Sequence, residues 1–352
     1  MLKCIYCMKT DSDGETFKSQ EHICSASVGG KTMLLKGFVC DTCNEIVFSK
    51  LENDFINYSL ISLPRQFYGP GSRGSLSFNK ASKTSIHLLT DVNSLQRKGL
   101  GYISMGCPHF LNQFIITNDQ KINFICGNTD QDASIIVNDL KSKVATFDSN
   151  NKYSFIELSE SEYTNATFIS FDKRKFYIAD RTRENALKNI EFIKGLIVAN
   201  KLTSNFVKEF FESHTLSHQK IGMNLDNDSR LIVKYGFNLF AYCRSHDYIL
   251  SPKFDNTRNY VHHSGNEHRN PIITDGHYDD KFKSLFPDKS HFLFLVNHEY
   301  ATYIIASFYG FEINYAVKLF DFIEDVDMIG LVIDWKNQKD ILLSEHLKNM
   351  CT

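Results

Sequence analysis

The sequence predicts an α+β protein with a small metal-bound module at its N-terminus and a larger mixed domain that is first β-rich and then α-rich. Three observations carry this prediction. Two Cys-x2-Cys pairs fall within the first 43 residues. Short apolar runs separated by Asn, Asp, Gly and Lys follow from about residue 75. A helical period of apolar residues begins near Asp180.

Composition is that of an ordinary globular protein, with 42% apolar and 23% charged residues and a formal net charge of −2. Any nucleic-acid contact must therefore come from local basic patches. The N-terminus has no apolar stretch of signal-peptide length. The long apolar run HFLFLVNHEYATYIIASFYGF is interrupted by polar residues. We expect it to be buried core and not a membrane span, and we expect a cytoplasmic protein.

Four regions are expected: a module over 1–58, a linker rich in Pro, Gly and Arg over 59–74, a β-rich region over 75–178 and a mainly helical region over 179–352. Strand candidates are TSIHLLT, QFIITN, KINFIC, SIIVN, ATFISF and, late in the chain, MIGLVIDW. Helix candidates are RENALKNIEFIKGLIVANKL and SRLIVKYGFNLFAYCR, together with the module's stripe of Val47, Leu51 and Phe55.

The paired cysteines are typical of a structural zinc site. Cys4-x2-Cys7 and Cys40-x2-Cys43 supply four thiolates that can close a tetrahedral site. A module of this size is small for a core of its own, so zinc would supply much of its stability. A redox pair or four unrelated thiols is the alternative. The other cysteines are expected to be apolar fillers or incidental surface thiols: Cys24, Cys107, Cys126, Cys243 and Cys351.

The segment between the two cysteine pairs must run out, turn and return. Gly29-Gly30 lies in the middle of this excursion, where a flexible turn is needed. We expect a strand, a glycine loop, a second strand and a helix, with zinc pinning both ends. That order brings Glu21, His22 and Asn44 towards one point.

The combined pattern C-I-Y-C … E-H-I-x-x-x-S-x-G-G … V-C-x-x-C-N resembles the HNH endonuclease family in its zinc-stapled ββα-metal, treble-clef-like form. The resemblance covers about residues 1–58. It implies that His22 is the general base and that Glu21 and Asn44 hold a catalytic Mg²⁺ or Mn²⁺, while the four cysteines hold structural Zn²⁺. The family usually has proline where this chain has Ser25.

These residue types suit the hydrolysis of a phosphodiester. A neutral imidazole can take a proton from water at pH 7, and oxygen donors suit a hard cation that stabilises the phosphate and the leaving 3′ oxygen. A solvated strand end is the alternative for Glu21-His22, and a helix-start residue capping backbone amides is the alternative for Asn44. Glu52 and Asp54 on the following helix could add a ligand, but we expect them to lie on a solvated helix face.

Two further groups of polar residues are candidates for binding. Basic residues interleaved with aromatics follow the module and suit phosphate contact, with ordinary solvated loops as the alternative: Arg65, Arg73, Lys80 and Lys83. The stretch YVHHSGNEHRNPIITDGHYDD gathers histidines and carboxylates at spacings that match no ligand pattern, so we expect a polar loop there.

Three functions remain open. The first is a metal-dependent endonuclease that acts on DNA in preference to RNA. The second is a non-catalytic zinc module that binds nucleic acid. In the third, the C-terminal region holds the nuclease idle until a ligand or partner arrives. The resemblance suggests a role in bacterial restriction or phage defence. Concerted double-strand cuts would need two active sites and hence a homo-oligomer.

Overall fold

The computed structural model describes residues 2–77, 80–91, 97–127, 132–150, 153–160, 165–202, 205–207, 215–217, 223–263, 269–276 and 279–350. The chain forms two compact units. The first contains Met1–Ser82 and Ile221–Thr352, and the second contains Lys83–Lys220. The second unit is therefore an insertion in the sequence of the first, and the architecture is mixed α+β.

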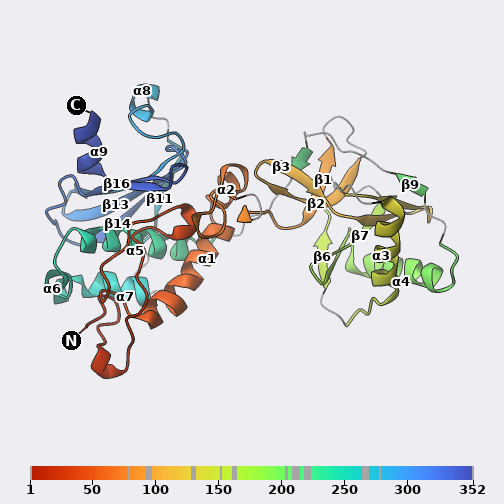
Figure 1. Ribbon diagram of the computed structural model, residues 1–352, viewed down its shortest axis with the longest axis horizontal. Helices are drawn as coiled ribbons and strands as arrows, with labels where there is room; N and C mark the ends of the chain where they lie inside the picture. The colour runs from red at the N-terminus through yellow and green to blue at the C-terminus, as the bar shows by residue number, and fades with distance from the viewer. Residues whose placement is uncertain are drawn as a thin grey trace. The chain divides into compact units, whose positions relative to one another are not determined.

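A six-stranded antiparallel sheet organises the first unit, in the order β11-β14-β13-β12-β15-β16 (Figure 1). Its strands are β11 (Ile272–Thr274), β12 (His291–His298), β13 (Ala301–Phe308), β14 (Ile313–Phe320), β15 (Gly330–Asp334) and β16 (Lys339–Leu342). Helix α5 (Leu225–Tyr242) crosses one face of this sheet. The short α8 (Asp280–Lys283) and the C-terminal α9 (Leu343–Met350) lie on the other side.

The long apolar run of the sequence forms the hairpin of β12 and β13, and MIGLVIDW supplies β15, so both expectations are confirmed. The region over 179–352, which we expected to be mainly helical, thus also contains a sheet. Strands covered on both faces read as continuous apolar runs, and such runs carry no alternation that distinguishes them from buried helices. Within the described residues, no helix combines the length and the apolar character needed to cross a membrane.

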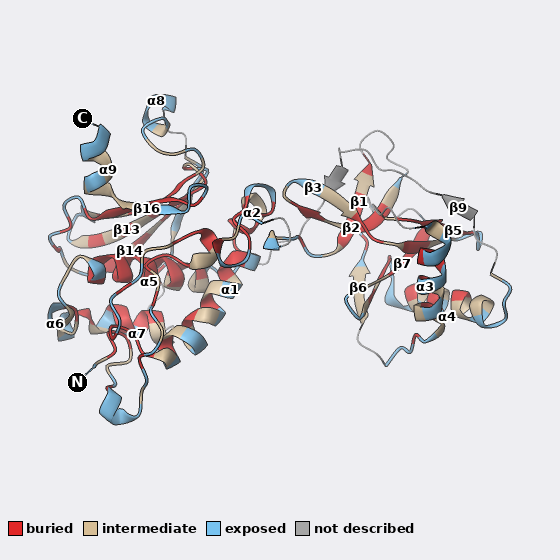
Figure 2. Ribbon diagram, in the orientation of Figure 1, coloured by how far each residue is buried: buried red, intermediate tan, exposed pale blue. Residues whose placement is uncertain are grey.

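Helix α5 forms the centre of the first unit's core. The side chain of Asn224 caps its start by accepting a hydrogen bond from the Asn227 amide. From Leu231 to Ala241 all of its residues are buried, because the sheet covers one side and the N-terminal module covers another. Figure 2 shows buried residues running through α5, the sheet and the module. The module therefore shares a core with the C-terminal region.

The N-terminal module has little regular structure before its helix. It contains the 3-10 turns η1 (Asp11–Asp13) and η2 (Ala26–Val28), a π-helical segment η3 (Thr42–Phe48) and α1 (Ser49–Tyr58). The predicted amphipathic stripe is confirmed, with Leu51 and Phe55 buried and Val47 packed against the core. The remaining helices of the unit are α2 (Ser62–Tyr68), η4 (Ser72–Gly74), α6 (His246–Ile249), η6 (Pro252–Phe254) and α7 (Asp255–His263).

The second unit contains two sheets. One has the order β10-β1-β2-β3 and the other β6-β8-β7-β4-β5-β9. Their strands are β1 (His87–Asp91), β2 (Lys98–Ser104), β3 (Cys107–Phe110), β4 (Gln113–Thr117), β5 (Ile122–Ile125), β6 (Tyr153–Glu157), β7 (Ala166–Asp172), β8 (Lys175–Asp180), β9 (Asn205–Val207) and β10 (Thr215–Ser217). Helices α3 (Ala133–Ala145) and α4 (Arg183–Val198) pack against the larger sheet.

One strand prediction in this unit is wrong. SIIVN lies in α3, whose start is capped by the side chain of Asp132. Ile136, Leu140 and Val144 recur every four residues on its buried face. A five-residue apolar run is too short to show this period, which extends beyond it. The predicted helix at α4 is confirmed, with Thr182 as its capping residue.

The chain divides at other places than the sequence-based boundaries. The stretch 59–74, expected to be a linker, contains α2 and η4 within the first unit. The unit boundaries fall at Ser82 and Lys220 instead of at residues 74 and 178. An insertion that begins and ends in polar segments leaves no compositional signal at these points.

Candidate active site

Four thiol groups of the module come together as a candidate zinc site. The Sγ atoms of Cys4, Cys7, Cys40 and Cys43 all lie within 4.8 Å of one another. Cys4 Sγ is 3.8 Å from Cys43 Sγ, and Cys7 Sγ is 3.7 Å from Cys40 Sγ. Tetrahedral zinc with Zn–S bonds of about 2.3 Å places its sulfur atoms about 3.8 Å apart. The cluster therefore fits zinc, as the spacing of the cysteines predicted.

The first cysteine pair is held from two sides. The amide of Cys4 donates to the Lys9 carbonyl at 2.9 Å, which closes the turn. The amide of Ile5 donates to the Phe38 carbonyl at 2.9 Å, which ties this turn to the segment before the second pair. From α7, the buried guanidinium of Arg258 donates through Nε to the Ile5 carbonyl at 3.0 Å. The C-terminal region thus supports the zinc site directly.

Glu21 and His22 lie where the segment between the cysteine pairs folds back on itself. The Ile23 amide donates to the Thr32 carbonyl at 2.9 Å, and the Leu34 amide donates to the Glu21 carbonyl at 2.8 Å. His22 and Met33 form an isolated antiparallel bridge between them. The expected order of segment, loop, segment and helix is present, with the two strands reduced to this short pairing.

The glycine pair is required by close contacts. Gly29 has φ +99°, and a Cβ atom there would lie 2.3 Å from the Cβ of Trp335. A Cβ atom on Gly30 would lie 2.0 Å from the carbonyl oxygen of Cys24. A further contact fixes the loop, since the amides of Lys31 and Thr32 donate to Asp340 Oδ2 at 2.7 and 2.6 Å. The loop is therefore seated against the end of the sheet.

A buried lysine joins two carboxylates at this site. Lys234 of α5 is fully buried, and its Nζ lies 2.5 Å from Glu21 Oε1 and 2.6 Å from Glu52 Oε1. Glu21 is 4% exposed, whereas the Glu52 side chain keeps 24% of its surface. A buried charge needs such partners, because desolvation without them is expensive. Glu52, expected on a solvated face, therefore belongs to this cluster.

Burial and the shared ammonium act in opposite directions on these groups. Burial raises the pKa of Glu21 above its ordinary value, and the Lys234 charge opposes this rise. Burial also disfavours the ionised form of Glu52, but Lys234 outweighs it and the pKa of Glu52 is lowered. The two carboxylates hold Lys234 as a cation by raising its pKa, although burial alone would lower it.

Asn238, one turn further along α5, contacts the Glu21–His22 pair. Its Nδ2 donates to the His22 carbonyl at 2.9 Å and approaches Glu21 Oε1 at 3.4 Å. Its Oδ1 accepts a hydrogen bond from the Tyr6 hydroxyl at 2.6 Å. Tyr6 stands between Cys4 and Cys7 in the first cysteine pair. The amide of Asn238 thus connects the zinc site to the Glu21–His22 pair.

The imidazole of His22 is half-buried, and none of the described residues forms a hydrogen bond with it. Burial lowers its pKa, and the Lys234 charge acts in the same direction while Glu52 opposes it. At neutral pH the ring is therefore neutral, which is the form that can accept a proton. Ser25, where the family usually has proline, bonds instead to the Tyr235 hydroxyl at 2.5 Å.

Asn44 lies in the first turn of the helical segment that follows the second cysteine pair. It is the third residue of η3 counted from Thr42, and its Nδ2 donates to Ser19 Oγ at 3.2 Å. Ser19 in turn donates to Asp41 Oδ1 at 2.6 Å. This hydrogen bond uses the amide nitrogen and leaves the amide oxygen, which is the atom a metal ion requires. The role of Asn44 as a ligand remains a prediction.

The four basic candidates differ in exposure. Arg65 is 5% exposed and donates to the Ser27 carbonyl at 3.2 Å and to Ser82 Oγ at 3.0 Å. Its guanidinium therefore braces the loop before Gly29 and is not presented to a phosphate. Arg73 and Lys80 are exposed in the first unit. Lys83 is exposed in the second unit, where its Nζ lies over the Tyr102 ring.

The histidine-rich stretch is described only in part, since Glu267, His268 and His277 lie outside the described residues. His262 and His263 end α7 with their rings in contact, and Asp279 caps α8. Among the residues that the structure describes, the four cysteines are the only cluster of His, Cys, Asp and Glu suited to a metal ion.

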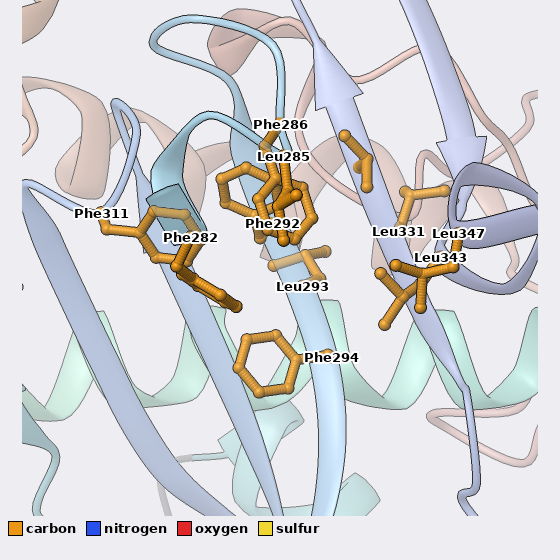
Figure 3. Close-up of a pocket in the computed structure, with 11 residues that line it drawn as sticks. Phe282, Leu285, Phe286, Phe292, Leu293, Phe294, Phe311, Leu331, Leu343 and Leu347 are labelled. Carbon is orange, nitrogen blue, oxygen red and sulfur yellow. The ribbon is translucent and has the colours of Figure 1, made fainter. Parts of the chain in front are cut away.

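An apolar pocket of about 210 Å³ lies on the side of the sheet that faces α9 (Figure 3). Phe286 and Phe292 come from the neighbouring loop and β12, and Leu343 and Leu347 come from α9. All of its lining side chains are apolar: Phe282, Leu285, Phe286, Phe292, Leu293, Phe294, Phe311, Leu331, Val332, Leu343 and Leu347. Without a titratable group, this pocket offers no catalytic chemistry.

Comparison with known families agrees with the geometry of the module. Residues 4–60 match the HNH endonuclease family. No match was found among the curated proteins or among the solved structures. The N-terminal part of the chain is thus similar to HNH endonuclease domains, and the family match ends before the second unit begins.

The sequence did not point to Lys234 or Asn238 as parts of this site, and for Glu52 it favoured a solvated helix face over a role as a ligand. One signal was present, because Lys234 and Asn238 are polar residues four apart inside the otherwise apolar stretch LIVKYGFNLFAY. Residues at this spacing share one face of a helix. Polar residues on the face of a buried helix need partners, and the sequence could not say that these partners lie more than 180 residues earlier.

Proposed function

We propose that this protein is an endonuclease that hydrolyses phosphodiester bonds of DNA, with His22 as the general base. The observation that carries the proposal is the half-buried imidazole of His22, whose pKa is lowered by burial, beside Glu21 within a module in which four cysteine side chains come together. A ring without a hydrogen-bond partner among the described residues is free to take a proton from an attacking water.

A divalent ion, Mg²⁺ or Mn²⁺, is part of this proposal, with Glu21 and Asn44 as its ligands. The donor atoms fit a hard cation. Glu21 uses Oε1 for Lys234 and Asn238, and no described residue bonds its Oε2. Asn44 uses its amide nitrogen for Ser19 and keeps its amide oxygen. When bound, such an ion relieves charge on the phosphate and on the leaving oxygen.

Contacts to the DNA backbone are proposed for Arg73, Lys80 and Lys83, which are exposed. We also propose that the protein is cytoplasmic and acts in bacterial restriction or phage defence. The proposal further includes control by a ligand or partner and a homo-oligomer for double-strand cuts. The match to the HNH family supports only the nuclease part of the proposal, and the unit of Lys83–Lys220, which lies outside this match, is the candidate for control by a ligand or partner.

A non-catalytic zinc module that binds nucleic acid is the second candidate. Two observations favour it. Glu21 is 4% exposed with its charge already balanced by Lys234. The Asn44 side chain is bonded to Ser19. Both residues would then serve the fold alone.

Plasmid nicking by the zinc-loaded full chain separates the two candidates. The wild-type protein should cut DNA when Mg²⁺ or Mn²⁺ is added and not in buffer without a divalent ion. His22→Ala should lower the cleavage rate by about 100-fold or more, with zinc content and circular dichroism unchanged. Cleavage by His22→Ala at the wild-type rate would exclude His22 as the base. Binding of DNA without any cleavage would favour the second candidate.

A further inference from the structure

Helix α5 contributes two polar side chains to a site that otherwise belongs to the module. Lys234 and Asn238 lie one turn apart on the face that meets Glu21 and His22, and both are fully buried. They lie far outside residues 4–60, the part of the chain that matches the HNH family. Their presence at the Glu21–His22 pair therefore needs an explanation of its own.

We infer that Lys234 and Asn238 are positioning residues of the nuclease centre, which fix the Glu21 carboxylate and the His22 backbone for the reaction. This inference rests on the proposed function. It makes the centre a product of two distant parts of the chain, the module and α5.

Lys234 acts through Glu21 and not on DNA. Its ammonium has no exposed surface, so it cannot reach a phosphate. It lies 2.5 Å from Oε1 of Glu21 and so sets the direction of the other oxygen, Oε2. Carboxylates that serve as ligands are commonly held in this way by a second hydrogen-bonding group. The ion pair with Glu52 at 2.6 Å keeps the ammonium in place.

Asn238 fixes the orientation of the peptide that carries the imidazole. Its Nδ2 reaches the His22 carbonyl at 2.9 Å, so the backbone at His22 cannot rotate without losing this hydrogen bond. The Tyr6 hydroxyl, which donates to Oδ1 at 2.6 Å, decides which end of the amide faces His22. A base must be held within a fraction of an ångström of its working position, since small displacements are costly in rate.

The helix itself is a rigid support. Its neighbours Leu231, Tyr235 and Leu239 are fully buried in the core that the module shares with the sheet. A third contact to the module, from the Tyr235 hydroxyl to Ser25 Oγ at 2.5 Å, lies beside the pair without touching Glu21 or His22. Tyr235→Phe is therefore a matched control, because it removes one buried polar contact from the same helix.

The test is steady-state cleavage of plasmid DNA by full-length Asn238→Leu and Lys234→Met, with Tyr235→Phe beside them. Rates are divided by the fraction of folded, zinc-loaded protein, measured by circular dichroism and zinc analysis. We expect kcat per folded molecule to fall about tenfold or more in the first two variants, with KM for DNA unchanged. Tyr235→Phe should keep the wild-type kcat.

A second readout does not depend on cleavage. The ring signal of His22 in NMR spectra, assigned from its absence in His22→Ala, should move in Asn238→Leu and stay in place in Tyr235→Phe. A wild-type kcat per folded molecule in Asn238→Leu and Lys234→Met would overturn the inference while the proposed function stands. A wild-type protein that cuts no DNA would overturn both.

Discussion

The thiolate cluster and the lysine–carboxylate cluster lie close to each other in the first unit, but they are assembled in different ways. The four cysteines all come from the first 43 residues, and their spacing alone predicts a zinc site. The ion pairs of Lys234 join α5 to residues more than 180 positions earlier. The first cluster is thus built by a local segment, whereas the second exists only because the module shares a core with the C-terminal region.

Loss of zinc should have the largest effect on the local cluster. Cys40→Ala leaves three thiolates, and structural zinc in small modules contributes about 10–16 kcal/mol of apparent binding energy at pH 7. We expect the first 60 residues to lose their structure, seen as zinc loss and as rapid proteolysis in this segment. Cys107→Ala, at an exposed cysteine of the second unit, is the control and should change neither. Native protease resistance without metal would contradict a structural zinc site.

Lys234→Met should be the next most severe change, because it leaves two carboxylates without their cation. Breaking a buried ion pair by removing one partner costs about 3–5 kcal/mol. Urea unfolding measures this loss of stability. Adding Glu52→Gln to Lys234→Met should recover part of it, since one of the two unpaired charges disappears. Lys50→Met, at an exposed position on the module, should change stability by less than about 0.5 kcal/mol.

Asp228 offers a carboxylate on the same helix that lacks such a cation. Its Oδ2 is buried without a partner among the described residues, and burial raises its pKa to about 7. The folded state therefore binds a proton at pH values where the unfolded chain has released it, so this residue lowers stability as pH rises from about 4 to 7. Asp228→Asn should remove this dependence, measured as the urea midpoint against pH. An unchanged slope would mean that Asp228 is solvated.

Gly29→Ala should have a smaller effect that tests the seating of the loop. The added Cβ would meet Trp335 at a backbone conformation that alanine rarely adopts, at a cost of about 1–3 kcal/mol. Gly195→Ala, in the last turn of α4 with no atom within 4 Å of the new Cβ, should instead raise stability by about 0.5–1 kcal/mol. Equal changes in stability at both sites, measured by thermal unfolding, would show that the loop moves to accommodate the added methyl group.

Much of the fold followed from local patterns. The helices at α1, α4 and α5 and the strand at β15 were predicted because each carries a full apolar period or a long apolar run. The SIIVN segment failed because five residues are too few to distinguish a strand from one turn of α3. The insertion of the second unit could not be predicted, since no local composition marks Ser82 or Lys220 as a boundary.

The sequence by itself determined the cluster of four cysteines and the glycine loop, and it predicted the Glu21–His22 pair as a site, because these features depend on residue type and spacing within one short segment. Only the tertiary structure decided that Arg65 is buried, that Glu52 faces Lys234 and that Asn238 holds His22. The physical reason is that a buried charge or amide must find its partners wherever the folded chain places them. No spacing rule connects residues that are some 200 positions apart.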